Sequence, residues 1–190
     1  MSTTLVQGTK AGLEQIRQQA NFNDQSDAAA VSRQSHAQYL PAGTGRSYKS
    51  PIDQITFLLT GEQTGGAFFL LEAIVPPGCG NPPHIHDRED ETFYVQQGTL
   101  TVHVGGKTLN ASAGDVAHLP RGIAHCFQNN GDVDAKVLVV CAPAGLENFF
   151  ADAFYPAADW PDAMPPMNDA FMARLLTAAA NNGLRFLPPA

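Results

Sequence analysis

Charged residues are scarce in this chain of 190 amino acids, and basic residues are the scarcest of them. Charged side chains make up 15% of the chain, against about 25% in an ordinary soluble domain. With 11 Lys and Arg against 18 Asp and Glu, the formal net charge is −7. An acidic chain without a basic run is poorly suited to bind the phosphates of nucleic acids. We therefore expect a protein that does not bind nucleic acid.

Long hydrophobic runs are also missing. No apolar stretch approaches the roughly 20 residues that a membrane-spanning helix needs. Residues 1–10 lack the basic and apolar segments of a secretory signal. The cysteines, Cys79, Cys126 and Cys141, are odd in number and form no C-x-x-C pair, which is typical of reduced thiols. These absences predict a cytoplasmic protein without a membrane segment.

Glycine and proline, by contrast, are abundant. The 17 Gly and 14 Pro residues exceed the usual combined share of about 12%, and they separate short segments in which apolar and polar residues alternate. Closely spaced strands with no helix-length segment between them predict an all-β fold, an antiparallel barrel or sandwich. The predicted strands are 52–60, 67–75, 92–97, 99–104, 107–111, 116–119, 124–128 and 135–141.

The region before the strands has a different composition. Residues 1–46 are polar and rich in Gln, Ser and Ala, which predicts an N-terminal arm rather than part of the barrel. Within the arm, the spacing of Leu13, Ile16 and Ala20 favours a short helix. The predicted barrel then spans residues 47–145.

The region after the strands changes to helical spacing. Residues 146–190 therefore predict a C-terminal helical extension that packs on the barrel. Asn168 or Asp169 is expected to begin its second helix, and Gly183 is expected to end it. The residues of this helix expected to face inward are Phe171, Leu175, Leu176 and Ala179.

His84 and His86 are the residues best suited to chemistry. In a strand, residues i and i+2 point to the same face, so both imidazoles can reach one point. A bend over residues 87–90 would bring Glu91 to that point, and His125 is available as a fourth group. Three imidazoles and one carboxylate suit a divalent transition metal ion (Fe, Mn, Co, Ni or Zn) rather than Ca or Mg. An H-x-H pair alone also occurs in strands without a metal.

The spacing around these histidines resembles the two motifs of the cupin superfamily. The matching positions are Gly78, His84, His86, Glu91 and Gly98, then Gly114, Pro120, Gly122, His125 and Asn129. Three further stretches, 61–66, 82–86 and 144–150, are similar to single-domain bacterial cupins that resemble quercetin 2,3-dioxygenase.

This resemblance implies both a fold and a function. The implied fold is an antiparallel cupin β-barrel, or jelly roll, with an N-terminal arm and C-terminal helices. The implied metal ligands are His84, His86, Glu91 and His125, and Glu91 would also be the catalytic base that accepts a proton from a substrate hydroxyl. The implied activity is that of a metal-dependent dioxygenase, which takes dioxygen and a flavonol-like or other enol or phenolic small molecule.

Two other functions stay open. A non-oxidative isomerase or lyase would use the ion as a Lewis acid, and a non-catalytic cupin would only bind a small molecule. Isomerases and lyases of this kind usually line the pocket with Arg, Lys and Tyr. The inward positions of this chain are apolar, which disfavours an isomerase or lyase. Cupins often dimerise through sheet edges, so the resemblance also implies a homodimer, with the arm before residue 47 lying across the partner.

Strand alternation extends the candidate site beyond the four ligands. If these ligands face inward, the same parity places Phe93, Val95, Ile123 and Phe127 inward too. Phe93 and Phe127 are then expected to contact the aromatic part of the substrate. An apolar lining with a few polar groups is typical of small-molecule sites.

The remaining polar features are expected to have structural roles. His103 alternates with apolar residues and should face away from the barrel interior. The acidic residues Asp87, Glu89 and Asp90 are expected to form a solvated loop. The run 129–131, Asn-Asn-Gly, predicts a hairpin turn.

Overall fold

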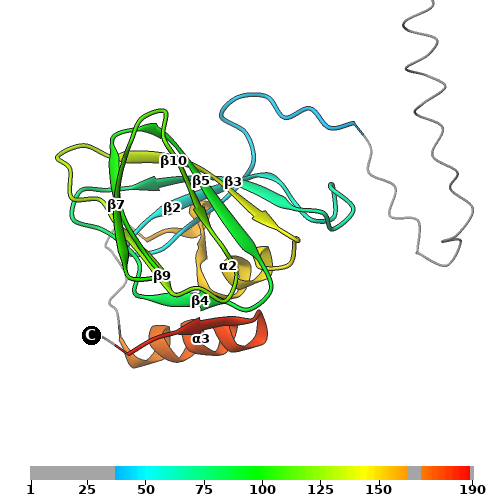
Figure 1. The fold of residues 1–190 in the computed structure, drawn as a ribbon. Helices are drawn as coiled ribbons and strands as arrows, with labels where there is room; N and C mark the ends of the chain where they lie inside the picture. The colour runs from blue at the N-terminus through cyan, green and yellow to red at the C-terminus, as the bar shows by residue number, and fades with distance from the viewer. Residues whose placement is uncertain (1–36, 162–167, 189–190) are drawn as a thin grey trace, which may run out of the picture. The chain divides into compact units, whose positions relative to one another are not determined.

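The computed structural model describes residues 37–161 and 168–188, in which antiparallel strands form two sheets (Figure 1). The larger sheet has seven strands in the order β11-β1-β2-β3-β10-β5-β8, and the smaller has five in the order β12-β4-β9-β6-β7. The predicted all-β jelly roll is confirmed. The strands are β1 (Arg46–Lys49), β2 (Gln54–Leu59), β3 (Phe69–Val75), β4 (His84–His86), β5 (Asp90–Gln97), β6 (Thr99–Val104), β7 (Lys107–Ser112), β8 (Val116–Leu119), β9 (His125–Gln128), β10 (Ala135–Ala142), β11 (Tyr155–Pro156) and β12 (Leu184–Phe186). The helix predicted around Leu13 lies outside the described residues.

The core follows from strict alternation in the central strands. In β3 and β10, every second residue is buried, and the two strands pair along their whole length from Ala135 opposite Val75 to Cys141 opposite Phe69. Because the side-chain period of a strand is two, this pattern turns one complete apolar face toward the interior. Each fully buried large apolar side chain contributes roughly 1.5–3 kcal/mol to stability.

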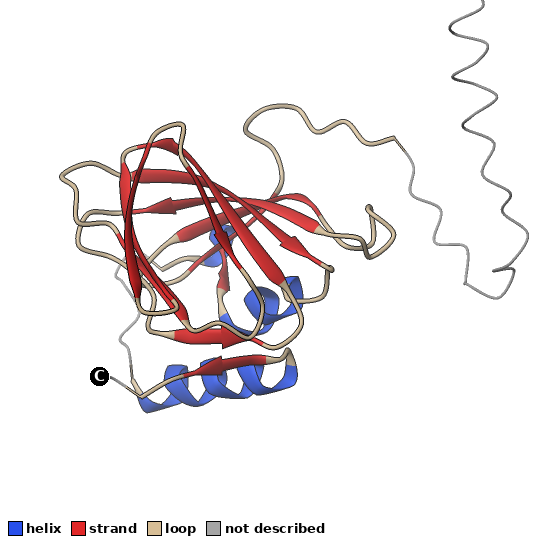
Figure 2. Cartoon of the chain, in the orientation of Figure 1, coloured by secondary structure: helices blue, strands red, loops and turns tan. Residues whose placement is uncertain are grey.

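Helices follow the last long strand and gather on one side of the sheets (Figure 2). They are α2 (Glu147–Ala153), the short 3-10 helix η1 (Ala157–Asp159) and α3 (Asp169–Asn181). Asn168 begins α3 as predicted, because its side chain accepts a hydrogen bond from the backbone N–H of Phe171 at 2.9 Å. Leu176, expected to face inward, is 51% exposed, so that expectation is wrong. Among the described residues, no helix is both long and apolar enough to cross a membrane.

The chain after α3 returns to the barrel as a strand, which the sequence reading did not anticipate. β12 pairs antiparallel with β4, so that Leu184 lies opposite His86 and Phe186 opposite His84. In Figure 1, β12 runs between β4 and α3. The C-terminal segment therefore supplies both helices and an edge strand beside the strand that carries two of the candidate ligands.

The connection between β9 and β10 is not a hairpin. The two strands belong to different sheets, so the predicted hairpin at 129–131 is wrong. Asn129 is fully buried, and its side-chain amide donates to the carbonyl oxygens of Val75 and Val133, each at 2.8 Å. The side-chain oxygen Oδ1 of Asn129 accepts from the backbone N–H of Gly131 at 2.9 Å. These bonds fasten the chain where it crosses from the smaller sheet to the larger one.

Candidate metal centre

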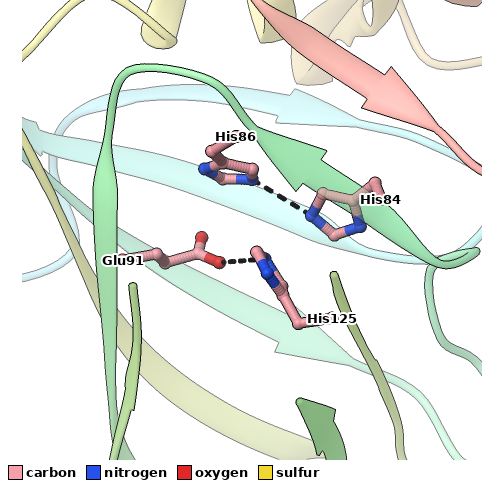
Figure 3. A group of neighbouring side chains, drawn as sticks. All are labelled: His84, His86, Glu91 and His125. Carbon is pink, nitrogen blue, oxygen red and sulfur yellow. Dashed lines mark hydrogen bonds and ion pairs between the residues drawn. The ribbon is translucent and has the colours of Figure 1, made fainter. Parts of the chain in front are cut away.

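Four side chains from three strands converge inside the barrel (Figure 3). His84 and His86 come from β4, Glu91 from β5 and His125 from the first position of β9. All four are buried, and one ligand atom from each lies within 4.8 Å of the others. His84 and His125 are directly opposite each other in the β4–β9 pair. The four residues that the sequence groups as candidate ligands thus lie together in one cluster.

The imidazole rings are oriented with one nitrogen toward the cluster. Nδ1–H of His84 donates to the carbonyl oxygen of Pro82, and Nδ1–H of His125 donates to that of Ile123, each at 2.9 Å. With Nδ1 of each ring bonded in this way, Nε2 is the ring atom directed into the cluster, and it binds a metal ion when it carries no proton. Nε2 of His84 lies 3.0 Å from Nε2 of His86. Ligand atoms about 2.1 Å from one ion, at right angles, are about 3 Å apart, so this spacing suits a shared ion.

A loop between β8 and β9 brings His125 to the cluster. Arg121 binds Asp90 at the start of β5 through its backbone N–H at 2.9 Å and through its guanidinium at 3.0 and 2.7 Å. The next residue, Gly122, donates its N–H to the carbonyl oxygen of His86 at 2.8 Å. Gly122 has φ +75°, a backbone conformation that glycine adopts without strain. These contacts hold the loop against β4 and β5 and so place His125.

Burial and mutual contact set the protonation of the cluster. Burial, together with the neighbouring His125, lowers the pKa of His84 to about 3. Burial also lowers the pKa of His86. For Glu91, burial opposes ionisation, but the contact with His125 and the nearby His86 outweighs it and lowers the pKa below its ordinary value. For His125, burial opposes protonation, but the contact with Glu91 outweighs it and raises the pKa. His84 and His86 as neutral imidazoles and Glu91 as a carboxylate are in the forms that bind a cation, and His125 would give up a proton to do so.

Cys141 contacts the carboxylate from the neighbouring strand, a role that the sequence reading missed. Its thiol donates to Oε1 of Glu91 at 3.6 Å, while Oε2 of Glu91 lies 3.3 Å from Nε2 of His125. Burial and the adjacent carboxylate raise the pKa of the Cys141 thiol well above its ordinary value, so the thiol keeps its proton. The contact orients the carboxylate. Only the β5–β10 register, with Cys141 opposite Glu91, reveals it.

Glu89 also lies in a different environment from the one that the sequence predicts. Its side chain is 1% exposed, so it does not belong to a solvated loop. Burial raises the pKa of its carboxyl group, and its nearest cation is Nε of Arg88 at 3.9 Å. Glu89 lies in the loop just before β5, where strand alternation does not apply, so no periodicity in the sequence indicates its burial.

Not all of the apolar residues predicted to face inward beside the cluster do so. Phe93 and Val95 are buried, and the ring centroids of Phe93 and Phe127 lie 5.8 Å apart in an edge-to-face arrangement. Ile123, expected to face inward, is 40% exposed, because it lies in the loop before β9, where strand alternation does not apply. His103 is exposed, as expected, and hydrogen-bonds Thr108 at 3.0 Å.

A cavity of about 560 Å³ adjoins the cluster. His84 and Phe127 belong to its lining, whereas Phe93 does not. The cavity is within the size range of sites that enclose small organic ligands. A cavity with aromatic lining therefore lies next to one of the candidate metal ligands.

Comparison with known proteins agrees with this architecture. Residues 71–141 match the Cupin domain family. The chain is 48% identical over 67 residues to germin-like protein 5-1 of rice (Oryza sativa subsp. japonica), covering 33% of this chain and 30% of that protein. It is 35% identical over 101 residues to the quercetin 2,3-dioxygenase of Aspergillus japonicus, covering 50% of this chain and 29% of that protein. The chain thus spans about 30% of the length of these curated relatives.

A solved structure shows the same fold at low identity. KdgF from Halomonas sp. superposes with a TM-score of 0.52 at 20% identity, covering 57% of this chain and 94% of that one. The superposition concerns the fold alone.

Proposed function

Because the chain belongs to the cupin superfamily, we propose that it is a metal-dependent oxygenase acting on a flavonol-like or other enol or phenolic small molecule. The observation that carries the proposal is the buried set of three imidazoles and one carboxylate beside an aromatic cavity. The quercetin 2,3-dioxygenase relative, aligned with 50% of the chain, supports the oxygenase class.

His84, His86, Glu91 and His125 would hold one divalent transition ion, Fe, Mn, Co, Ni or Zn. The Nε2 atoms of His84 and His125, directed into the cluster by the Nδ1 hydrogen bonds, fit this role. When bound, such an ion supplies Lewis acidity toward an enol or phenol oxygen and, if it is redox-active, chemistry with dioxygen.

Glu91 would accept the proton of the substrate hydroxyl. Its carboxylate is ionised and is held from both sides, by the Cys141 thiol on Oε1 and by His125 beside Oε2. A positioned carboxylate of this kind acts as a general base when the hydroxyl comes within hydrogen-bond reach. Phe127, which lines the cavity, would contact the aromatic part of the substrate, and Phe93, expected to do the same, would support the Phe127 ring edge-to-face. Dioxygenation places both oxygen atoms in the product and takes its electrons from the substrate, so it needs no further reductant.

Oxygen uptake tests this proposal. Protein loaded in turn with Fe(II), Mn, Co or Ni is expected to consume dioxygen when quercetin is added, as followed with an oxygen electrode. A His118→Ala variant is the matched control, because His118 is exposed and belongs neither to the cluster nor to the lining of the cavity, and it should retain the full rate. A metal-loaded protein that stays inert toward quercetin and toward a broad panel of phenols and diketones would contradict the proposal.

A further inference from the structure

The cavity beside the cluster is bounded in about equal parts by the Cupin domain match and by segments outside it. Its lining includes the β1–β2 turn, residues 78 and 80–82, His84 of β4, His103 of β6, and side chains from β9, α2, α3 and β12. Residues 71–141 supply the side nearest the cluster, whereas α2, α3 and β12 supply much of the rest. The aromatic lining consists of Phe127, Phe149, Phe154, Phe171 and Phe186.

The C-terminal strand joins this cavity to the cluster. Phe186 pairs with His84 across β12 and β4, and the two ring centroids lie 6.2 Å apart. His84 is the one member of the cluster that lines the cavity among the described residues. A molecule in the cavity would therefore lie against His84 at one end and against α3 on its flank.

The charge of the lining selects against anions. Among its described residues there is no Lys or Arg, and the only carboxylate is that of Asp53. The Ser50 hydroxyl donates to Oδ1 of Asp53 at 2.5 Å. An anionic ligand would lose its hydration without gaining a Lys or Arg partner, and it would also face this carboxylate. A neutral ligand with a hydroxyl group has an acceptor in Asp53 and an apolar surface around it.

We propose that this cavity is a binding site for an uncharged, aromatic-rich small molecule that carries at least one hydroxyl group, and that α3 and β12 belong to the site. The use of that molecule as a substrate rests on the proposed function. The binding itself can be measured without turnover.

Filling the cavity from α3 tests its location. Leu175 lines the cavity, and the adjacent Leu176 is exposed and does not. Calorimetric titration of the protein as purified with 2-naphthol is expected to show binding that Leu175→Trp weakens at least about tenfold, while Leu176→Trp leaves it unchanged. Met172→Trp, which also fills the cavity, replaces Leu175→Trp if circular dichroism shows that variant to be unfolded. Equal binding by cavity-filling variants and the Leu176→Trp control would overturn the proposal.

Matched probes test the charge selection. 2-Naphthoate has the same rings as 2-naphthol but carries a negative charge, and at pH 7.5 it is expected to bind at least about tenfold more weakly. Asp53→Asn should reduce the difference in affinity between 2-naphthol and 2-naphthoate. Equal affinity for both probes in the unaltered protein would contradict the inference. Binding of 2-naphthol without any oxygen uptake would support the cavity site and contradict the oxygenase. Oxygen uptake and 2-naphthol binding that are both unaffected by Leu175→Trp and Met172→Trp would contradict the cavity site and leave the oxygenase standing.

Discussion

Replacing Glu91 with glutamine is expected to lower the rate of metal-dependent oxygen uptake by at least about 100-fold, the usual range for a lost general base. Glutamine keeps the shape of the side chain and one oxygen toward the cluster, but it cannot accept the substrate proton. The carboxylate is buried, and the thiol of Cys141 and the ring of His125 hold its two oxygens. The rate is measured with the oxygen electrode, and metal content is determined on the same sample.

Glu72→Gln is the matched control for this variant. Glu72 is a carboxylate of β3 paired with Lys136 at 3.0 Å, away from the cluster. It should keep the full rate of oxygen uptake. A Glu91→Gln protein that retains its metal and also its full rate would remove Glu91 from the role of base.

Removing the metal ion is expected to lower the melting temperature by roughly 8–16 °C. An ion that binds only the folded state, at a free concentration about 1,000 times its Kd, adds about 4 kcal/mol to the free energy of unfolding. A domain of this size gains roughly 2–4 °C in Tm for each kcal/mol. Melting is followed by circular dichroism on protein dialysed against chelator and on the same protein after reloading.

A pair of double variants controls for effects unrelated to the cluster. His86→Ala with His125→Ala should abolish the metal-dependent shift in Tm, because only two of the four ligands remain. His103→Ala with His118→Ala removes two exposed histidines outside the cluster and should keep it. An equal metal-dependent shift in both double variants would place the ion elsewhere.

The sequence predicts the local part of the centre well. His84 and His86 share a face because a strand repeats every two residues, and their Nε2 atoms lie 3.0 Å apart. His125 is different, because 38 residues lie between it and His86 and no local period links the two. Its membership in the cluster was implied by the resemblance of the second motif. Short-range parity and a family spacing together indicated all four residues.

Errors arise where the chain leaves a regular strand or changes sheet. Ile123 lies in a loop, so strand parity misplaced it. The turn residues at Asn129 signal a reversal, but local composition does not say which sheet the next strand joins. The contact between Cys141 and Glu91 depends on the register between β5 and β10. The two residues are 50 positions apart, so no local sequence pattern predicts this register.

The sequence pattern does not predict the cavity either. Residues 146–190 read as helical, and three residues at their end, Leu184–Phe186, form a strand only because β4 offers an unpaired edge. Strand propensity is weak in so short a segment, and tertiary context decides it. That pairing places Phe186 beside His84 and gives the C-terminal segment its part in the proposed ligand site.

Elemental analysis of protein purified without chelator tests the central claim most directly. The account predicts about one divalent transition ion per chain in the unaltered protein and almost none in the His86→Ala, His125→Ala double variant. An unaltered protein that takes up no ion even after loading, or a double variant that retains as much metal as the unaltered protein, would contradict it.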